Sequence, residues 1–342
     1  MGVSIRDVAR RLNLSITTVS RALDGYPDVS AVTRQEVIRV ANEMGYSPNP
    51  AARQLRRHRA DAIGYILPAS SPRFNDPFFA EFVAGLGDQA SRHNYDLLIT
   101  TASPEEEQER LVYRRWVQGR RVDGIVLNRV RLKDWRAEFL LEMGLPFAGL
   151  ESPDNLTASG RCGFVEVDSR GGFKHLVNHL VQRGHRRIAF IGGHPGLKIQ
   201  AGRLEGYCLG LTGAGLQFDP SLVVNGQMSS QGGYSAALAL LSLPQPPTAI
   251  LCVNDTTAVG VLHAAHELGL EIGSELAVAG CDGIEETEHT LPPLTTLKLP
   301  LYEIACKLVE MLLELIAGRE PPDQNRMVEP ELIVRESTGK LS

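Results

Sequence analysis

The residues best suited to chemistry with a polyanion lie in the first sixty residues. This segment contains ten arginines, no lysine and five acidic residues, a net charge of +5 in a chain whose formal net charge is -5. Arg21 ends a run with helical spacing, where a guanidinium can donate two hydrogen bonds to a guanine edge. Hydroxyl groups that can donate to phosphates, or alternatively cap helices, are found at Ser4, Ser15, Thr18 and Ser20. These residue types predict a DNA-binding segment.

Two short helices around a tight turn would position these side chains. Apolar residues recur at helical spacing at Ile5, Val8, Ala9 and Leu12, after Ser4 as N-cap. In the second helix, capped by Ser15, the residues expected to point outward are Ile16, Thr17, Ser20 and Arg21. A third helix is expected over 31–44. This is the layout of a helix-turn-helix domain, here residues 1–46, whose second helix lies in the DNA major groove.

Residues 47–60 read as a hinge helix or linker. Asn49 and Pro50 can start a helix, but only about two turns follow, and so short a helix is marginal without a partner. An apolar Leu55 among arginines needs a hydrophobic destination, and two such leucines in a dimer would wedge into the minor groove. The predicted minor-groove residues are Ala52, Arg53, Leu55 and Arg56. The alternative is a linker that only packs on the body.

From residue 61 the pattern changes to apolar strands that alternate with helices, which predicts parallel sheets covered on both faces. The expected fold class is α/β: the helical N-terminal domain, then a body (61–342) of two doubly wound subdomains with a cleft between them. Ligands bind beyond the carboxyl ends of such strands. Polar residues that follow predicted strands are Ser70, Ser71, Asp168, Asn254, Asp255 and Asp282. Asp168 and Asp255 could instead cap the helices that follow them.

Several other classes of protein are disfavoured. The five cysteines are widely spaced, with no C-x-x-C pair, and no signal peptide or membrane-length apolar run is present, so we expect a cytoplasmic protein without disulfides. Neither a phosphate-binding G-x-x-x-x-G-K-[ST] loop nor a G-x-S-x-G elbow occurs. The pairs His175/His179 and His263/His266 lack a clear third ligand. We therefore expect no enzyme activity, no cofactor and no metal.

The chain resembles the lactose-repressor (LacI/GalR) family of bacterial transcription regulators. The segments that carry the resemblance are Ile5–Ala9, Leu14–Leu23, Met44–Leu55, Gly184–Gly192 and Pro292–Leu297. The resemblance implies a homodimer and a body like a periplasmic sugar-binding protein. It also implies one subdomain of residues 62–161 and 292–322 and another of 162–291 and 323–340.

The resemblance further assigns residues. Ile16 and Thr17 occupy the positions that select the operator sequence, and Phe79, Asp168, Arg203, Asn254 and Asp282 match effector-binding positions. Phe79 could instead belong to the core, whereas a buried Arg203 would need an anionic or multiply accepting partner.

The expected function is a dimeric DNA-binding repressor whose pseudo-palindromic operator is released when an effector binds in the cleft. A sugar or glycoside is preferred over a purine as effector. No leucine-heptad tail follows Thr338, so a tetramer is not expected. A transport protein would need an export signal and no DNA-binding segment. The other rival is a cytosolic sugar-binding or sugar-converting protein with an accessory DNA-binding module.

Overall fold

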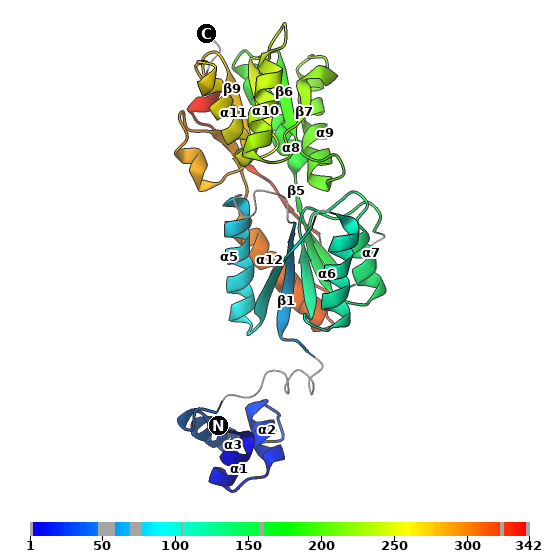
Figure 1. The fold of residues 1–342 in the computed structure, drawn as a ribbon, viewed down its shortest axis with the longest axis vertical. Coiled ribbons are helices and arrows are strands. Elements are labelled where there is room, and N and C mark those ends of the chain that lie inside the picture. Colours follow the sequence, from blue (N-terminus) through cyan, green and yellow to red (C-terminus); the bar gives the residue numbers. More distant parts are fainter. Residues whose placement is uncertain are drawn as a thin grey trace. The chain divides into compact units, whose positions relative to one another are not determined.

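The computed structural model describes residues 3–46, 59–68, 77–103, 105–156, 161–321 and 325–339. The chain divides into two units, Met1–Ala60 and Asp61–Ser342, which we call the head and the body (Figure 1). Within the described residues, no helix is both long and apolar enough to cross a membrane.

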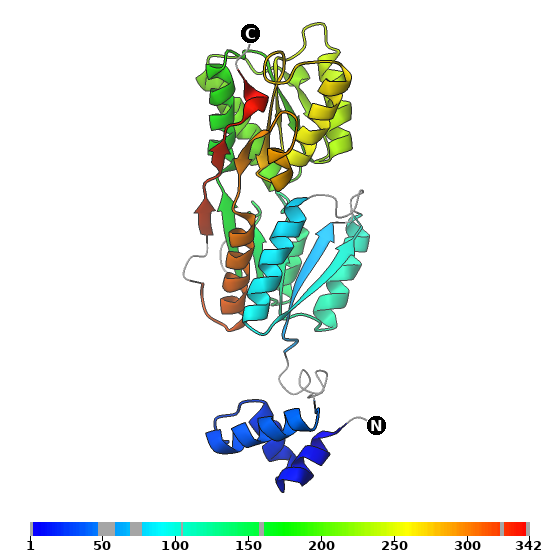
Figure 2. The same cartoon turned by 90° about the vertical axis from the view of Figure 1, so that its left-hand side faces the viewer.

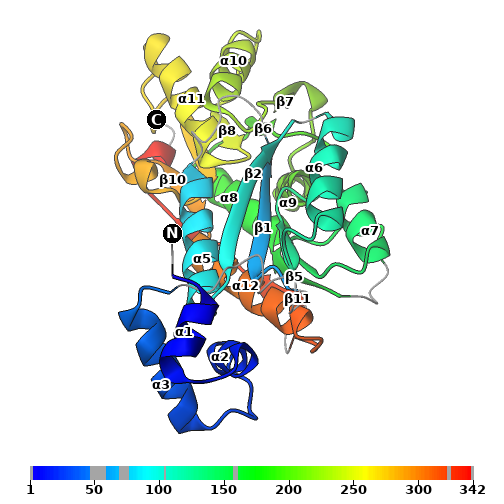
Figure 3. The same ribbon diagram turned by 60° about the horizontal axis from the view of Figure 1, so that its bottom comes forward.

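The described part of the head contains three helices, α1 (Ile5–Leu12), α2 (Ile16–Leu23) and α3 (Ala31–Glu43) (Figure 3). Ser4 starts α1, where its backbone N–H and its hydroxyl both donate to the Asp7 carboxylate, at 3.0 and 2.6 Å. Asn13 ends the helix in the left-handed conformation, with φ 52°. The small apolar core comprises Val8, Ala9, Val19, Ala22, Val29, Val37, Val40 and Ala41. The three predicted helices are thereby confirmed.

Over the residues that the structure describes, the body contains two six-stranded sheets. The first has the order β11-β5-β4-β3-β1-β2 and is parallel throughout, and the second has the order β12-β10-β9-β8-β6-β7, in which only β12 is antiparallel to its neighbour. The strands are β1 (Ala62–Pro68), β2 (Asp96–Ala102), β3 (Gly124–Leu127), β4 (Phe147–Leu150), β5 (Cys162–Val167), β6 (Ile188–Gly192), β7 (Val223–Asn225), β8 (Ala249–Cys252), β9 (Ala277–Asp282), β10 (Thr295–Lys298), β11 (Asn325–Val328) and β12 (Glu331–Ile333).

Helices cover both faces of each sheet, as the predicted doubly wound fold requires (Figures 1 and 2). The first sheet carries α5 (Pro77–Arg92), α6 (Glu106–Gln118), α7 (Trp135–Glu142) and α12 (Leu301–Ile316). The second carries α8 (Ser169–Gln182), α9 (Lys198–Gly213), α10 (Ser230–Leu241) and α11 (Asp255–Glu267), with the short 3-10 helices Pro220–Leu222, Glu285–Glu288 and Glu336–Thr338. We call the first sheet with its helices the first subdomain, and the second sheet with its helices the second subdomain.

The predicted boundaries between the subdomains are wrong at three places. β5 was expected in the second subdomain but lies in the first, where Phe147 of β4 is in register with Cys162. β10 was expected in the first subdomain, within 292–322, but pairs with β9 of the second. β11 was expected in the second, within 323–340, but pairs with β5 of the first. The apolar pattern of such a strand suits either sheet, so it does not show with which neighbouring strand the backbone hydrogen bonds form.

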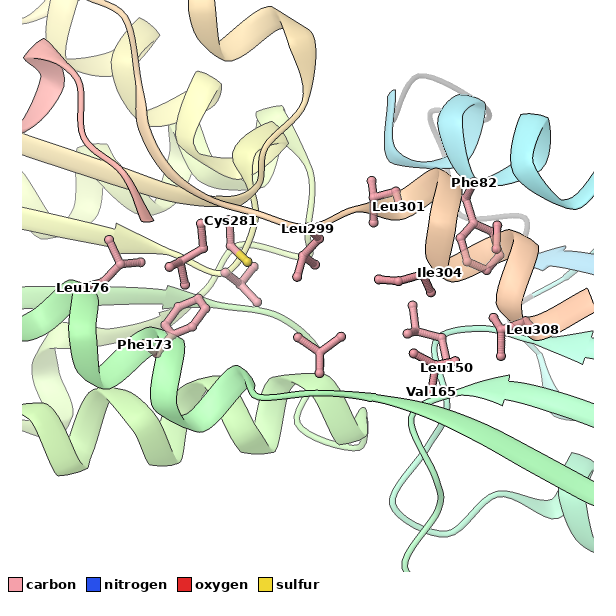
Figure 4. Close-up of a cluster of buried hydrophobic side chains, with 14 of the residues drawn as sticks. Phe82, Leu150, Val165, Phe173, Leu176, Cys281, Leu299, Leu301, Ile304 and Leu308 are labelled. Atoms are coloured by element: carbon pink, nitrogen blue, oxygen red, sulfur yellow. The ribbon is translucent and has the colours of Figure 1, made fainter. Parts of the chain in front are cut away.

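The apolar core continues through the crossover between the subdomains. Figure 4 shows Phe173 and Cys281 in the second subdomain, Ile304 in the first, and Leu299 and Leu301 between them. Leu299 and Leu301 are 2% and 0% exposed. Helix α12 then packs so closely on α5 that a Cβ at Gly85 would lie 2.5 Å from the Tyr302 carbonyl oxygen. The chain segment that enters α12 is therefore held in a close-packed environment.

Candidate DNA-binding surface and effector pocket

Helix α2 presents the predicted base-reading residues. The side chain of Ser15 caps the helix by accepting a hydrogen bond from the Thr18 backbone N–H at 3.0 Å. Ile16 is 45% exposed, and Thr17 is also exposed. Arg21 forms an ion pair with Asp28 at 2.7 Å and lies over the Tyr26 ring, 4.7 Å from its centroid.

The predicted phosphate-contacting residues have different surroundings. Ser4 and Ser15 are exposed and serve as helix caps, and the Thr18 hydroxyl is 2.8 Å from that of Ser15. Ser20 was expected to point outward, which is wrong: it is 7% exposed, and its hydroxyl donates to Asp24 at 3.4 Å. Ser20 lies about 60° around the helix from Leu23, at the border of the apolar stripe, so it packs inward with that stripe.

The predicted hinge residues Ala52, Arg53, Leu55 and Arg56 lie outside the described residues, as does Ser70.

A pocket lies between the two subdomains of the body. Residues from both subdomains line it: Phe78, Asn128, Arg129, Val130, Leu150, Glu151, Ile199, Arg203, Met228 and Asp282. Most of the first-subdomain residues follow the ends of β3 and β4. This is the strand edge at which α/β proteins bind ligands.

Arg203 and Asp282, both predicted effector-binding residues, meet in this pocket. Arg203 Nη2 lies 3.2 Å from Asp282 Oδ1, and the two side chains are 1% and 6% exposed. Arg203 Nη1 donates to the Val253 carbonyl, while its Nε is buried without a hydrogen-bond partner. Asp282 has φ 117°, a left-handed backbone conformation that is strained for a residue with a side chain. A buried, partly unsatisfied guanidinium at a pocket wall can serve a hydrogen-bonding ligand.

The other predicted effector residues do not line this pocket. Asp168 caps α8, with Oδ1 accepting from the Gly171 N–H at 2.8 Å. Asn254 is 0% exposed and caps α11, with Oδ1 accepting from the Thr257 N–H at 3.2 Å and Nδ2 left without a partner. Phe79 is half-buried against the core, with the Arg129 guanidinium 5.0 Å from its ring centroid.

Asp255, which was also named as a polar residue that follows a predicted strand, has a structural role. It is fully buried and accepts from the N–H groups of Gly283 and Ile284 and from the Thr296 hydroxyl, at 2.6, 3.1 and 2.6 Å. Burial raises its pKa to about 6, against the opposing effect of these hydrogen bonds. Its role is to hold the loop after Asp282.

The sequence analysis missed Asn128 and Glu151, although each directly follows a predicted strand. The backbone after β3 is held by Arg136, which is 4% exposed and donates to the carbonyls of Asn128 and Arg129 at 3.3 and 3.1 Å. Arg129 adopts φ 48° there. The strand-end rule could have identified both missed residues had it been applied to β3 and β4 as well.

Val130, which lines the pocket, belongs to a direct contact between the subdomains, which we call the cleft latch (residues 130–132 and 196–198). The Lys198 N–H donates to the Val130 carbonyl and the Leu132 N–H to the Gly196 carbonyl, both at 2.9 Å. The Lys198 ammonium group pairs with Asp154, which follows β4. The latch therefore ties the start of α9 to the first subdomain.

Among the described residues, no group of three or more His, Cys, Asp or Glu side chains is placed to hold a metal ion. The cysteines within this part of the chain are free thiols.

Known proteins resemble both units. Residues 4–49 match the bacterial regulatory proteins of the lacI family, and residues 177–338 match the periplasmic binding protein-like domain. The HTH-type transcriptional regulator AglR of Rhizobium meliloti (strain 1021) is 34% identical over 342 residues, which cover 99% of this chain and 95% of that protein. The chain belongs to the lacI family. The predicted family and fold class are thereby confirmed.

Two solved structures extend the likeness over nearly the whole of this lacI-family chain. The lac repressor dimer bound to operator and the anti-inducer ONPF has a TM-score of 0.85 and 27% identity, covering 99% of this chain and 100% of that one. The complex of the transcriptional regulator CelR with cellobiose has a TM-score of 0.75 and 27% identity, covering 98% and 99%. The protein is a DNA-binding transcriptional regulator controlled by a small-molecule effector.

Proposed function

We propose that this lacI-family protein is a homodimeric repressor of a pseudo-palindromic operator and that a sugar or glycoside bound in the pocket lowers its affinity for DNA. The buried Arg203–Asp282 pair carries the proposal for the pocket, because it fixes a guanidinium and a carboxylate side by side at the wall. Sugars present many hydroxyl groups, each of which can donate and accept hydrogen bonds. The Arg203 guanidinium can donate to a sugar hydroxyl, and the Asp282 carboxylate can accept from one.

The rest of the lining also suits a sugar. Asn128 supplies an amide, and the apolar side chains of Phe78, Ile199 and Met228 can cover the C–H face of a pyranose ring. The similar CelR structure contains cellobiose, a disaccharide. A purine effector remains the alternative, since a planar base could lie against Phe78.

Effector control requires that the ligand bind two conformations of the body with different affinity. The pocket has walls from both subdomains, and Val130 of the cleft latch lines it, so a ligand there contacts both subdomains at once. We propose that binding changes the angle between them. That change would then alter how far apart the two hinge segments of a dimer lie, and the segments around Leu55 would lose their hold on DNA.

On the DNA side, Arg21, Ile16 and Thr17 are proposed to read bases in the major groove. Arg21 would donate to a guanine, and Ile16 suits a thymine methyl group. Ser4, Ser15 and Thr18 are proposed to contact phosphates. The solved dimer of the lac repressor on its operator supports two-fold binding of this kind.

A combined screen tests the proposal. Full-length protein is melted with monosaccharides, disaccharides, purines and amino acids, and each compound that raises the melting temperature is then titrated into a complex with an operator selected from random DNA. We expect a sugar to raise the melting temperature and to weaken operator binding. Phe78→Ala should abolish the shift, whereas the matched control Phe218→Ala, outside the pocket, should keep it. Stabilisation by purines alone would contradict the sugar assignment.

The rival proposal of a sugar-converting protein makes a different prediction. Chromatography of the same sugars after incubation with the protein would reveal products if it were right, and we expect the sugars to be recovered unchanged. The hinge is tested separately: Leu55→Ala should weaken binding to the operator far more than binding to random DNA, and equal losses would count against the minor-groove wedge.

A further inference from the structure

Two carboxyl groups meet where β4 ends beside β5, at the edge of the pocket. Glu151 directly follows β4, and its backbone N–H donates to the Val165 carbonyl at 2.9 Å, which extends the pairing of the two strands. Each glutamate side chain then bonds across to the other strand. Glu151 Oε1 accepts from the Val167 N–H at 3.2 Å, and Glu166 Oε1 accepts from the Ser152 N–H at 3.0 Å.

This crossed arrangement places the two carboxyl groups beside each other, because each is bonded to the backbone of the strand that carries the other. Two ionised carboxylates in this position repel each other and have no donor to share, whereas a protonated group can donate to an ionised neighbour, so the arrangement favours one proton on the pair. Glu151 is the better candidate: it is 6% exposed, whereas Glu166 is only half-buried. Burial, together with the hydrogen bond to Glu166 and repulsion by it, raises the pKa of Glu151 to about 9.

The charged groups that face the pair do not reverse this conclusion. Arg203, on α9, attracts an ionised Glu151 but is already paired with Asp282. Lys198, at the start of α9, acts on both glutamates from a distance, while its ammonium group is bonded to Asp154. The nearby positive charges are thus each matched by another carboxylate.

We infer that Glu166 is a positioning residue that holds Glu151 as a neutral carboxylic acid in the pocket, so that the pocket takes an uncharged, hydroxyl-bearing effector and discriminates against a cationic one. The inference rests on the proposed function and narrows it. Asp282 is already paired with Arg203, so with Glu151 neutral the lining offers an ammonium group no uncompensated anion. A neutral Glu151 still accepts a hydrogen bond from a sugar hydroxyl.

The state of Glu151 can be measured without any effector. Infrared difference spectra of the full-length protein at neutral pH should contain the C=O band of a protonated carboxyl group. That band should vanish in Glu151→Gln, which lacks the group. It should also vanish in Glu166→Gln, whose amide can donate to Glu151 and so favours the ionised form. The band should persist in Glu142→Gln, a control at an exposed helix end. A spectrum of the parent protein with no such band, or a band that survives Glu151→Gln, would overturn the inference.

The pH dependence of unfolding gives a second readout. The folded protein keeps the proton on Glu151 up to about pH 9, whereas an unfolded glutamate loses it near its usual pKa of 4.5. The unfolded state therefore binds fewer protons between these values, and stability falls as the pH rises through this window. Glu151→Gln has no such proton to lose, so its stability should not fall in this window. The melting temperature of the variant minus that of the parent should therefore increase by several degrees between about pH 5 and about pH 9 and then stay constant. A difference that does not change with pH would contradict a neutral Glu151.

Ligand discrimination is tested with matched pairs, glucose against glucosamine and galactose against galactosamine, and with the disaccharide cellobiose. In the parent protein we expect the neutral sugar of a pair to bind and its amino counterpart to bind at least about tenfold more weakly. Glu166→Gln should reduce that ratio about tenfold, whereas Glu151→Gln and Glu142→Gln should keep it. An unchanged ratio in Glu166→Gln would overturn the ligand assignment. If no sugar binds, the proposed function is contradicted. The protonation state of Glu151 is then tested by the infrared spectra and the melting curves alone.

Discussion

Two arginine–aspartate pairs, one in the head and one in the body, have similar chemistry in opposite surroundings. Arg21 and Asp28 of the head are 43% and 54% exposed, whereas Arg203 and Asp282 of the body are 1% and 6% exposed. An exposed ion pair contributes less than about 1 kcal/mol to stability, because water and salt compete with it. A buried pair that loses one partner leaves an uncompensated charge in the interior.

The difference indicates two uses of the same interaction. Arg21 can exchange its ion pair with Asp28 for a hydrogen bond to a guanine edge at little cost in free energy. Asp28 therefore orients the Arg21 side chain without preventing it from binding DNA. Arg203 is held in the interior by Asp282, so any donor of its guanidinium that a ligand reaches would have a fixed geometry. Fixed groups of this kind avoid the entropy cost of ordering them on binding.

The largest expected effect is on the buried pair. Asp282→Ala should lower the free energy of unfolding of the body by about 3–5 kcal/mol, because it leaves the Arg203 guanidinium unpaired. Urea denaturation followed by circular dichroism measures the change. Asp28→Ala, the matching truncation in the head, should change stability by about 0.5 kcal/mol or less. Similar losses in the two variants would remove the contrast between the pairs.

The next effect concerns DNA. Arg21→Ala should weaken binding to the operator by about 1–3 kcal/mol, since one bidentate base contact is lost, and should weaken binding to random DNA by much less. Fluorescence anisotropy at fixed salt measures both affinities. Equal losses on the two DNAs would assign Arg21 to phosphates.

The cleft latch should contribute a smaller amount. Lys198→Asp places two carboxylates opposite each other and should weaken effector binding by about 1 kcal/mol, because Val130 of the latch lines the pocket. Lys198→Asp combined with Asp154→Lys should recover most of the loss, and isothermal titration calorimetry measures each step of this double-mutant cycle. Additive losses in the double variant would show that the pair is not coupled to the ligand.

The smallest effect should come from releasing Arg21. Asp28→Asn should tighten operator binding by no more than about fivefold, in keeping with the small worth of an exposed pair. Glu43→Gln, which removes a carboxylate paired with Arg39 on α3, controls for the general change in charge. Should both variants tighten binding equally, charge rather than the release of Arg21 would be the cause.

The sequence predicted local structure well where the apolar period was strong. The apolar run at 62–68 coincides with β1, and Ser30 caps the third helix, with its hydroxyl accepting from the Thr33 N–H at 3.1 Å. The short edge strands β7 and β12 have three residues each, too few for a period to be recognised. The apolar pattern of β5, β10 and β11 does not encode the sheet to which each strand belongs, because that depends on the strands with which each one pairs.

Only some of the pocket residues were predicted, because a sequence pattern does not show which contacts a polar side chain forms in the fold. Arg203 was predicted because the family resemblance places it at an effector-binding position, and Asp282 was predicted both from that resemblance and because it follows a predicted strand. Asn254 and Asp168 also follow strands, yet their side chains cap the next helices, and a polar residue at that place can do either. The neutral form of Glu151 depends on Glu166, fifteen residues away on the neighbouring strand, and no spacing rule in a single strand would reveal it.

The most direct test of the central claim is the affinity of the full-length protein for its selected operator, measured at increasing concentrations of the effector found by the screen. We predict at least about a fivefold loss of affinity, the scale of a typical coupling between two sites. The same titration with Phe78→Ala should show no change. An operator affinity that stays constant while the effector saturates the pocket would contradict the account.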